Sequence, residues 1–206
     1  MDVGPLYHSK LTTPDQAVKS VPSGSKLSMG MAMAEPPALL KALADRAEAG
    51  GIGELRVYYF EATRIAGETI LRYELNDRIS PYCMFITATE RALIKRGMED
   101  GGRKVVNYVP SNFHQAPRLL IDEIGIDTFV CTVSPMDRHG YFSFGTGNDY
   151  STKVARAAKR LIVEVNENMR WVGPGPNCTS RRSTQSSRTT FRCWNCRPAG
   201  RRRRTR

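Results

Sequence analysis

The 206-residue sequence has no uninterrupted apolar run near the roughly 18 residues of a membrane-spanning helix. Its first residues, MDVGPLYHSKLTTPDQ, lack the apolar core of a signal peptide. Neither common nucleotide fingerprint is present, because GTGNDYS contains no phosphate-loop lysine and no complete GxGxxG. We therefore predict a cytoplasmic protein without a membrane partner, and we disfavour Rossmann dehydrogenases and P-loop enzymes. At 40% hydrophobic and 25% charged residues, the chain is long enough to bury one core.

Acidic residues are missing from the last part of the chain. Residues 171–206 contain ten arginines but no Asp, Glu, Leu, Ile, Met, Lys, Tyr or His, whereas residues 1–170 are nearly neutral although the whole chain carries +11. A segment of this composition cannot supply an apolar core, so we predict a disordered, basic tail over 171–206. Through RRRR at 201–204 it would bind nucleic acid only nonspecifically, by phosphate contacts that weaken with salt.

The five cysteines do not form the ligand pattern of a metal site. CWNC at 193–196 is a single CxxC with only Cys178 upstream and no histidine in the tail, which leaves a tetrahedral zinc site one ligand short. We therefore predict no metal. Cys83 and Cys131 lie in apolar surroundings and are expected to be buried, reduced thiols.

Short helical patterns alternate with β-rich runs along the body, which predicts an α/β fold with an open, mostly parallel sheet flanked by helices. Caps and glycines predict helices that run through Val18, from Pro36 to Gly50, from Thr87 to a left-handed stop at Gly97, from Pro117 to Gly125, and from Thr152 to Arg160. Strands are expected at 24–31, 54–60, 84–86, 104–109, 127–133 and 161–165.

Two loops of this pattern are candidate binding sites, because open α/β sheets place ligands in the loops that follow their strands. In MGMAMAEPP, residues 29–37, a glycine and small side chains leave amides exposed ahead of a helix, which favours an oxyanion or phosphate. An ordinary strand-to-helix turn is the alternative. VPSNFHQAPR, residues 109–118, places Asn112, His114 and Arg118 beside one aromatic residue, and a surface or structural histidine is the alternative there.

A third loop, SPMDRHGYFSFGTG at 134–147, holds Ser134, Asp137, His139 and Ser143 within ten residues. Such a cluster could indicate Ser/His/Asp catalysis, yet triad partners usually come from separate elements and no GxSxG is present. A turn stabilised by Asp137 and Gly140, with His139 directed at a ligand, is the more economical interpretation.

Four segments together resemble the N-terminal half of the acetyl-CoA hydrolase/transferase family, which includes 4-hydroxybutyrate CoA-transferase. They are YHSKLTTPDQAV, MGMAMAEPPALLKAL, NYVPSNFHQAPRLL and IDTFVCTVSPMDRHGYFSFGTGNDYSTKVARAAKRLIVEVNENM. The resemblance covers residues 7–170, which we take as one CoA-transferase-like α/β domain. The run SPMDRHGYFSFG after an apolar strand is its most specific part.

The resemblance implies two similar halves with an active site between them, where CoA passes from an acyl-CoA to a small carboxylate. In the family a glutamate of the second half attacks the thioester and forms a glutamyl-CoA intermediate. The implied substrate is coenzyme A or its esters, with no permanently bound cofactor and with homo-oligomers allowed. The residues implied to line the pocket are Gly30, Met31, Ala32, Met33, Ala34, Glu35, Asn112, His114, Ser134, Asp137, His139 and Gly140.

The resemblance implies no catalytic residue in this chain, because the half with the glutamate is not included in it. Glu35 precedes a predicted helix, where a carboxylate stabilises the helix dipole, and Glu164 lies in an apolar strand, so neither is expected to substitute. We therefore expect a truncated chain that cannot complete the transfer cycle, and whose missing C-terminal domain would be its partner. The alternative is a noncatalytic binding module that holds nucleic acid through its tail.

The tail is expected to be out of frame. Residues 177–197, back-translated with allowed codons and read from the third base of each codon, permit LHVEEVDAVVENHVPLLELP, which resembles a continuation toward the second half. This reading predicts a frameshift near residues 169–173. The sequence does not distinguish a transferase from a hydrolase, and it does not identify the acceptor carboxylate.

Overall fold

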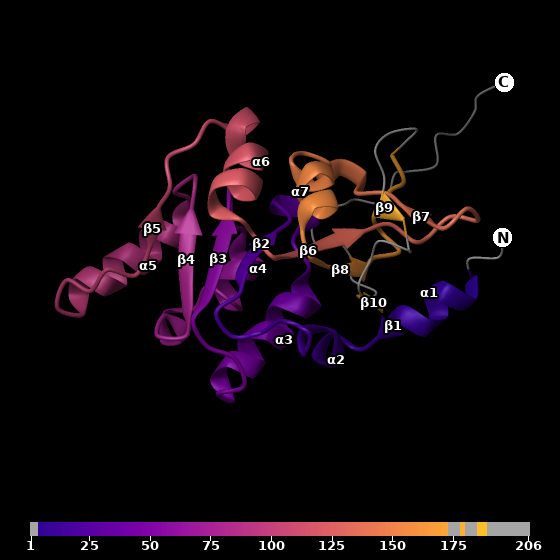
Figure 1. Ribbon diagram of the computed structural model, residues 1–206. Helices are drawn as coiled ribbons and strands as arrows, with labels where there is room; N and C mark the ends of the chain where they lie inside the picture. Colours follow the sequence, from indigo (N-terminus) through magenta and orange to yellow (C-terminus); the bar gives the residue numbers. More distant parts are fainter. Residues whose placement is uncertain (1–3, 173–177, 180–184, 189–206) are drawn as a thin grey trace, which may run out of the picture.

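The structure is a computed structural model that describes residues 4–172, 178–179 and 185–188. Its main sheet is entirely parallel, with the strand order β1-β10-β8-β6-β2-β3-β4-β5 (Figure 1). The strands are β1 (Leu11–Thr12), β2 (Lys26–Met29), β3 (Leu55–Tyr59), β4 (Ile79–Cys83), β5 (Asn107–Tyr108), β6 (Thr128–Val133), β8 (Arg160–Val165) and β10 (Gln185–Arg188). The fold class expected from the sequence is confirmed.

Helices connect these strands and cover both faces of the sheet (Figure 1). The α-helices are α1 (Gly4–Lys10), α2 (Pro14–Val18), α3 (Pro37–Glu48), α4 (Arg64–Glu68), α5 (Ala88–Glu99), α6 (Ala116–Arg118) and α7 (Ser151–Ala157). Shorter turns are η1 (Ala32–Ala34), η2 (Tyr73–Leu75), η3 (Phe113–Gln115), η5 (Gly145–Gly147) and the π-helix η4 (Leu119–Ile124). A separate antiparallel pair joins β7 (Tyr141–Phe142) to β9 (Cys178–Thr179).

The alternation of strand side chains divides the core into two layers. In β6, Val130 packs with the layer under α2, α3, α4 and α5, while Phe129 and Cys131 pack with the layer under α6, η4 and α7. Every residue of β6 is buried, as a strand covered on both faces requires. Cys83 and Cys131 are buried free thiols, as predicted.

Helix boundaries follow the predicted caps at most positions. Thr87 and Glu90 form the expected capping box, and Gly125 ends η4 in the left-handed conformation with φ 68°. Gly97 was wrongly predicted to stop its helix: it lies inside α5, which continues to Glu99. The left-handed residues that follow are Gly101 and Gly102.

The prediction of a strand at 84–86 is wrong. The structure has its strand immediately before these residues, as β4. Pro81 argues against a strand in the sequence, since proline has no amide to donate. The structure tolerates it because β5 pairs only with Tyr82 and Cys83, so β4 has a single partner strand at Pro81. The strand expected at 104–109 is shorter than predicted and consists of β5 alone.

Most of the predicted basic tail lies outside the described residues, including RRRR at 201–204 and the CWNC motif. Besides residues 171–172, the described parts are two short strands: β10 pairs with β8 and β1, and β9 pairs with β7. The disorder predicted for the tail and its proposed frameshift remain predictions.

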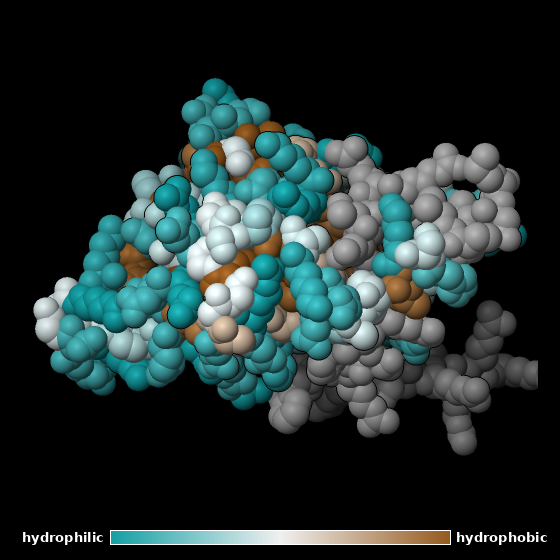
Figure 2. All heavy atoms as spheres, turned by 60° about the horizontal axis from the view of Figure 1, so that its bottom comes forward, coloured by the Kyte–Doolittle hydropathy of each residue, from teal (hydrophilic) through white to brown (hydrophobic). Residues whose placement is uncertain are grey.

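The face turned forward in Figure 2 is mostly hydrophilic, with apolar side chains in small, separate areas. Among the described residues, no helix combines the length and the apolar character that a membrane crossing requires.

Candidate functional site

The carboxyl ends of the parallel strands bring five loops to one edge of the sheet. Because β2 lies between β3 and β6, the loops after these three strands are neighbours there, and those after β4 and β5 continue the edge. In Figure 1 the arrows of β3 and β4 point toward the end of the sheet where α6 lies. Ligands of open α/β sheets bind at this kind of edge, so we call it the carboxyl edge.

The loop after β2 is tightly packed around Ala34. A Cβ added to Gly30 would lie 2.4 Å from the carbonyl oxygen of Ala34, and one added to Gly147 would lie 2.4 Å from the Ala34 Cβ. Both positions therefore require glycine, and η1 and η5 are in close contact. Ala32 has φ 49°, a strained conformation for a residue with a Cβ. The loop predicted to approach a ligand closely is therefore close-packed and strained.

Glu35 has a different role from the one predicted for it. Its carboxylate accepts hydrogen bonds from the Thr63 amide (2.6 Å) and the Thr63 hydroxyl (2.5 Å), so it caps the start of α4 rather than its own helix α3. The Thr132 hydroxyl donates to its carbonyl oxygen at 2.6 Å. Glu35 thus ties the loop after β2 to the loop after β3. Burial raises the pKa of Glu35 to about 7, although the hydrogen bonds from Thr63 act to lower it.

Two other buried glutamates also have structural partners. Glu164 of β8 accepts from the amides of Ala38 (3.0 Å) and Leu39 (3.1 Å), so this carboxylate, not Glu35, serves the start of α3. Burial raises its pKa to about 7. Glu90 accepts from the Thr87 amide and from the Tyr59 hydroxyl at 3.0 Å. None of these carboxylates is free to act as a nucleophile.

Aromatic side chains gather at the carboxyl edge from four loops. The Phe113 ring meets Phe60 edge-on at 4.8 Å between centroids and approaches Tyr150 at 6.3 Å, while Phe60 stacks on Phe85 at 6.3 Å. The Tyr150 hydroxyl donates to the Met29 carbonyl at 3.0 Å, which fixes this ring beside the end of β2. Phe85 and Phe113 remain 54% and 45% exposed, so the edge presents apolar surface to a ligand.

The loop after β6 forms a turn, as predicted. The Asp137 carboxylate accepts from the amides of His139 (2.9 Å) and Tyr141 (2.8 Å), and the Gly140 amide donates to the Asp137 carbonyl. The Ser134 hydroxyl accepts from the Ser143 amide at 3.0 Å. The polar residues of this loop therefore hold its backbone, and no Ser/His/Asp relay exists among them. That His139 faces a ligand remains a prediction.

The loop after β5 borders a cavity of about 540 Å³ between η3 and α7. Of the predicted residues, His114 lines this cavity, whereas Asn112 is exposed outside it and bonds weakly to Gln115 at 3.4 Å. Arg118 borders a different hollow near Pro110.

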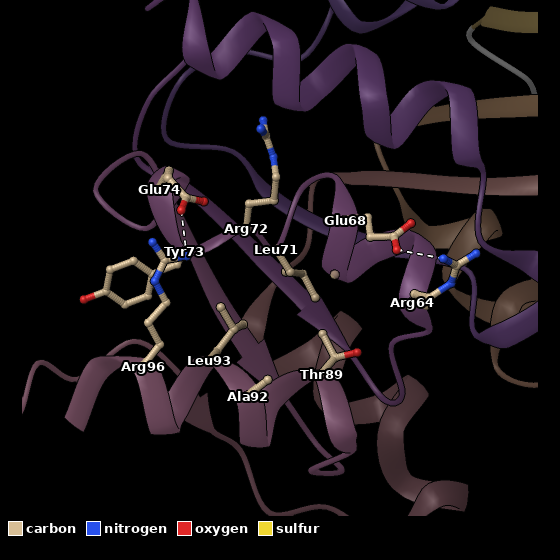
Figure 3. A pocket seen from close by; sticks show the side chains of 11 residues that line it. Arg64, Glu68, Leu71, Arg72, Tyr73, Glu74, Thr89, Ala92, Leu93 and Arg96 are labelled. Carbon is tan, nitrogen blue, oxygen red and sulfur yellow. Dashed lines mark hydrogen bonds and ion pairs between the residues drawn. The ribbon is translucent and has the colours of Figure 1, made fainter. Parts of the chain in front are cut away.

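A second cavity, of about 300 Å³, lies between α4, η2 and α5 (Figure 3). Leu71, Ala92 and Leu93 supply its apolar lining. Its arginines all have carboxylate partners, namely Arg64 with Glu68 (2.9 Å), Arg72 with Glu48 (2.5 Å) and Arg96 with Glu74 (2.6 Å). The Arg96 guanidinium also lies 4.4 Å from the centre of the Tyr73 ring.

The structure therefore brings some predicted residues together and leaves others apart. The segment 30–35 packs against 145–147 at the carboxyl edge, whereas Asp137, His139 and Gly140 belong to the turn that leads into β7. Phe60 and Glu61, which follow β3, are not among the residues predicted from the sequence. Glu61 is half-buried and has no ion-pair or hydrogen-bond partner among the described residues. The position directly after a buried strand was the signal that could have identified them.

Comparison with known proteins identifies the family of the chain. The profile of the acetyl-CoA hydrolase/transferase N-terminal domain matches residues 2–177. The chain is 34% identical over 170 residues to butyryl-CoA:acetate CoA-transferase of Anaerostipes caccae and 29% identical over 165 residues to 4-hydroxybutyrate coenzyme A transferase of Clostridium kluyveri. These alignments cover 79% and 80% of this chain but only 34% and 36% of the relatives, so the chain spans about a third of their length.

Among solved structures, RipA from Yersinia pestis has a TM-score of 0.90 and 67% sequence identity, covering 93% of this chain and 44% of RipA. Solved RipA variants include M31G, F60M and E61V, and this chain has the same residue types at those numbers. Two further RipA variants change a glutamate numbered beyond the 206 residues of this chain. A 4-hydroxybutyrate CoA-transferase from Porphyromonas gingivalis, at 22% identity and TM-score 0.70, shares the fold.

Proposed function

The chain belongs to the acetyl-CoA hydrolase/transferase family, and from this premise we propose that it forms one wall of the active site of a cytoplasmic acyl-CoA:carboxylate CoA-transferase. Two of the curated relatives are named for transfer between acyl-CoA and carboxylates. The observation that carries the proposal is the carboxyl edge itself, where a strained, close-packed loop adjoins exposed aromatic side chains. An acyl group and its thioester need such a combination of apolar walls and backbone amides.

The acyl group would lie against Met31 and Phe60, which both pack on the apolar layer under α6 and α7. Glu61 would supply the polar part of this pocket, because its half-buried carboxylate has no partner in the described part of the chain. The amides of the loop 30–35 would face the thioester oxygen as negative charge develops on it. The RipA variants at the same three numbers support this choice of residues.

The nucleophilic carboxylate would come from outside the matched N-terminal domain. Glu35, Glu90 and Glu164 are all committed to amides and hydroxyls at helix starts. In the proposed cycle a glutamate attacks the thioester carbonyl and expels CoA thiolate, which gives a mixed anhydride. The thiolate then attacks the glutamyl carbonyl, releases the first carboxylate and leaves a glutamyl-CoA thioester. An acceptor carboxylate reverses these steps with its own acyl group.

The proposal is tested by complementation. The chain is mixed with the C-terminal part of a RipA-like protein, and transfer of CoA from butyryl-CoA to acetate is followed. We expect turnover only with both parts present, and a loss of tenfold or more in kcat/KM for Phe60→Ala. Val57→Ala, a change in the opposite layer of the core, is the control for reduced stability alone. Turnover by the 206-residue chain alone, or none with the added part, would contradict the proposal.

A further inference from the structure

Phe113 lies between the Phe60 side chain and the cavity of about 540 Å³ beside α7. Its ring meets the Phe60 ring edge-on, at 4.8 Å between the ring centroids. The same side chain lines the cavity between η3 and α7, whereas Phe60 is not among the described residues that line it. The Phe113 ring therefore separates the Phe60 side chain from this cavity.

The Phe113 ring is held in place by its neighbours although it is 45% exposed. Tyr150 approaches it at 6.3 Å between centroids, and Tyr150 is itself fixed, because it is 3% exposed and its hydroxyl donates to the Met29 carbonyl at 3.0 Å. On Phe60, the Phe85 ring stacks at 6.3 Å, with 6° between the ring planes. Exposed side chains usually change rotamer within nanoseconds, whereas rings held in such pairs limit the size of a neighbouring ligand.

The cavity on which Phe113 borders has room for an alkyl chain. Its volume is within the range of small-molecule sites. Pro117 and Tyr150, which line it together with Phe113, are buried, while its cations Lys153 and Arg156 are exposed on α7. Removal of the Phe113 ring would therefore join the space beside Phe60 to a cavity with a partly apolar lining.

We propose that Phe113 is a specificity-determining residue that closes the acyl pocket beside Phe60 and so restricts the chain to short acyl groups. This inference rests on the proposed function, in which the acyl group lies against Met31 and Phe60. A butyryl group would end at the partition, whereas an octanoyl group would need the space that the Phe113 ring occupies. One methylene changes binding in a hydrophobic pocket by roughly 10- to 200-fold, so the partition is expected to have a large effect on chain-length preference.

The test is calorimetric titration of the full chain with butyryl-, hexanoyl- and octanoyl-pantetheine. These thioesters carry no phosphate, so the arginines of residues 171–206 do not attract them. Phe113→Ala and Phe113→Leu remove the ring to different extents, and Phe113→Tyr retains it. The matched control is Tyr108→Ala, because Tyr108 is an exposed aromatic residue of β5 that does not line the cavity. Circular dichroism reports whether each variant is folded, and Phe113→Leu replaces Phe113→Ala if the latter is not.

We expect the parent chain to bind butyryl-pantetheine at least tenfold more tightly than octanoyl-pantetheine. Phe113→Ala should reduce this ratio tenfold or more and Phe113→Leu by a smaller factor, with hexanoyl-pantetheine between the two other ligands. Phe113→Tyr and Tyr108→Ala should change the ratio less than twofold. A merely structural role of Phe113 would weaken all three ligands equally and leave the ratio as it is.

An unchanged ratio in Phe113→Ala, or an equal reduction in Tyr108→Ala, would overturn this inference and leave the proposed function standing. A parent chain that binds octanoyl-pantetheine as tightly as butyryl-pantetheine would do the same. If the parent chain bound none of the three thioesters, the proposed function would be contradicted and this inference with it.

Discussion

Two cavities of the domain, the α4–α5 cavity and the cavity between η3 and α7, differ in how their charges are balanced. In the α4–α5 cavity of Figure 3, each arginine has a glutamate partner, and one also lies over an aromatic ring. In the cavity beside α7, Lys153 and Arg156 have no partner in the described part of the chain. Internally paired charges stabilise a fold modestly, whereas unpaired exposed charges contribute little to the stability of the fold. The volumes of the two cavities do not reveal this difference.

The same contrast holds for the loops around the cavities. The carboxyl edge holds Ala32 at φ 49° and packs Gly30 and Gly147 against Ala34, while the α4–α5 cavity is lined by two α-helices and the turn η2, without a positive-φ residue in its lining. Strain of this kind persists only where the surrounding structure enforces it, and it concentrates at functional sites. The following predictions test this contrast.

The largest effect is expected from Gly30→Ala. Its new methyl group would lie 2.4 Å from a backbone carbonyl oxygen, so the loop after β2 must move, and we expect a loss of about 3 kcal/mol in unfolding free energy. Gly53→Ala is the control, because a Cβ there meets nothing within 4 Å and φ is not positive. Urea unfolding of both variants measures the difference. Equal stabilities would show that the edge is not close-packed.

A smaller, pH-dependent effect is expected at Glu164. Its folded pKa of about 7 exceeds the ordinary value of 4.5, so the folded state binds the proton more tightly than the unfolded state. This contribution is complete below about pH 4.5 and is lost as the pH rises through about 7, which amounts to on the order of 2 kcal/mol between pH 5 and pH 8.

The variant Glu164→Gln keeps an oxygen for the amides of Ala38 and Leu39 but cannot ionise. Unfolding free energies at pH 5 and pH 8 should therefore differ less in the variant than in the parent chain. The neighbouring Glu167→Gln, at an exposed position, is the control. An unchanged pH dependence in Glu164→Gln would mean that its carboxylate is not desolvated.

Thr87→Ala removes the N-terminal cap of α5, a helix that forms one wall of the α4–α5 cavity. The hydroxyl accepts from the Thr89 amide at 3.2 Å, and its loss should lower the unfolding free energy by about 1 kcal/mol. Thr87→Ser, which retains the hydroxyl, should keep most of the parent chain's stability, as measured by thermal unfolding. If serine were no better than alanine, the hydrogen bond would not be the source of the stability.

The smallest effect is expected from Arg96→Gln, which breaks an exposed ion pair and should lower the unfolding free energy by about 0.5 kcal/mol. Lys153→Gln/Arg156→Gln should leave the unfolding free energy within about 0.5 kcal/mol of the parent value, because no ion pair is broken. A stability loss in the double variant equal to that of Thr87→Ala would assign these cations to the fold.

The sequence predicted the sheet, its buried central strands and the capping box of α5, because these depend on local periodicity and local hydrogen bonds. The strand was predicted at 84–86 instead of at β4 because proline argues against a strand that contains Pro81. Local β-propensity cannot show that β5 is too short to pair with Pro81, which is why β4 tolerates it. Glu35 does not serve the helix predicted for it, and Glu164, for which only a place in a strand was predicted, does so instead. Each carboxylate caps a helix distant in sequence, a contact that no local pattern encodes. The unpaired state of Lys153 is equally invisible without the neighbours that the fold supplies.

Hydrogen exchange with butyryl-CoA tests the central claim most directly, since it compares both regions in one sample. We expect slower exchange of the amides in 30–35 and 60–63 at the carboxyl edge, with no change in 64–74 or 89–96 around the α4–α5 cavity. Protection confined to the α4–α5 cavity, with the carboxyl edge unchanged, would contradict it.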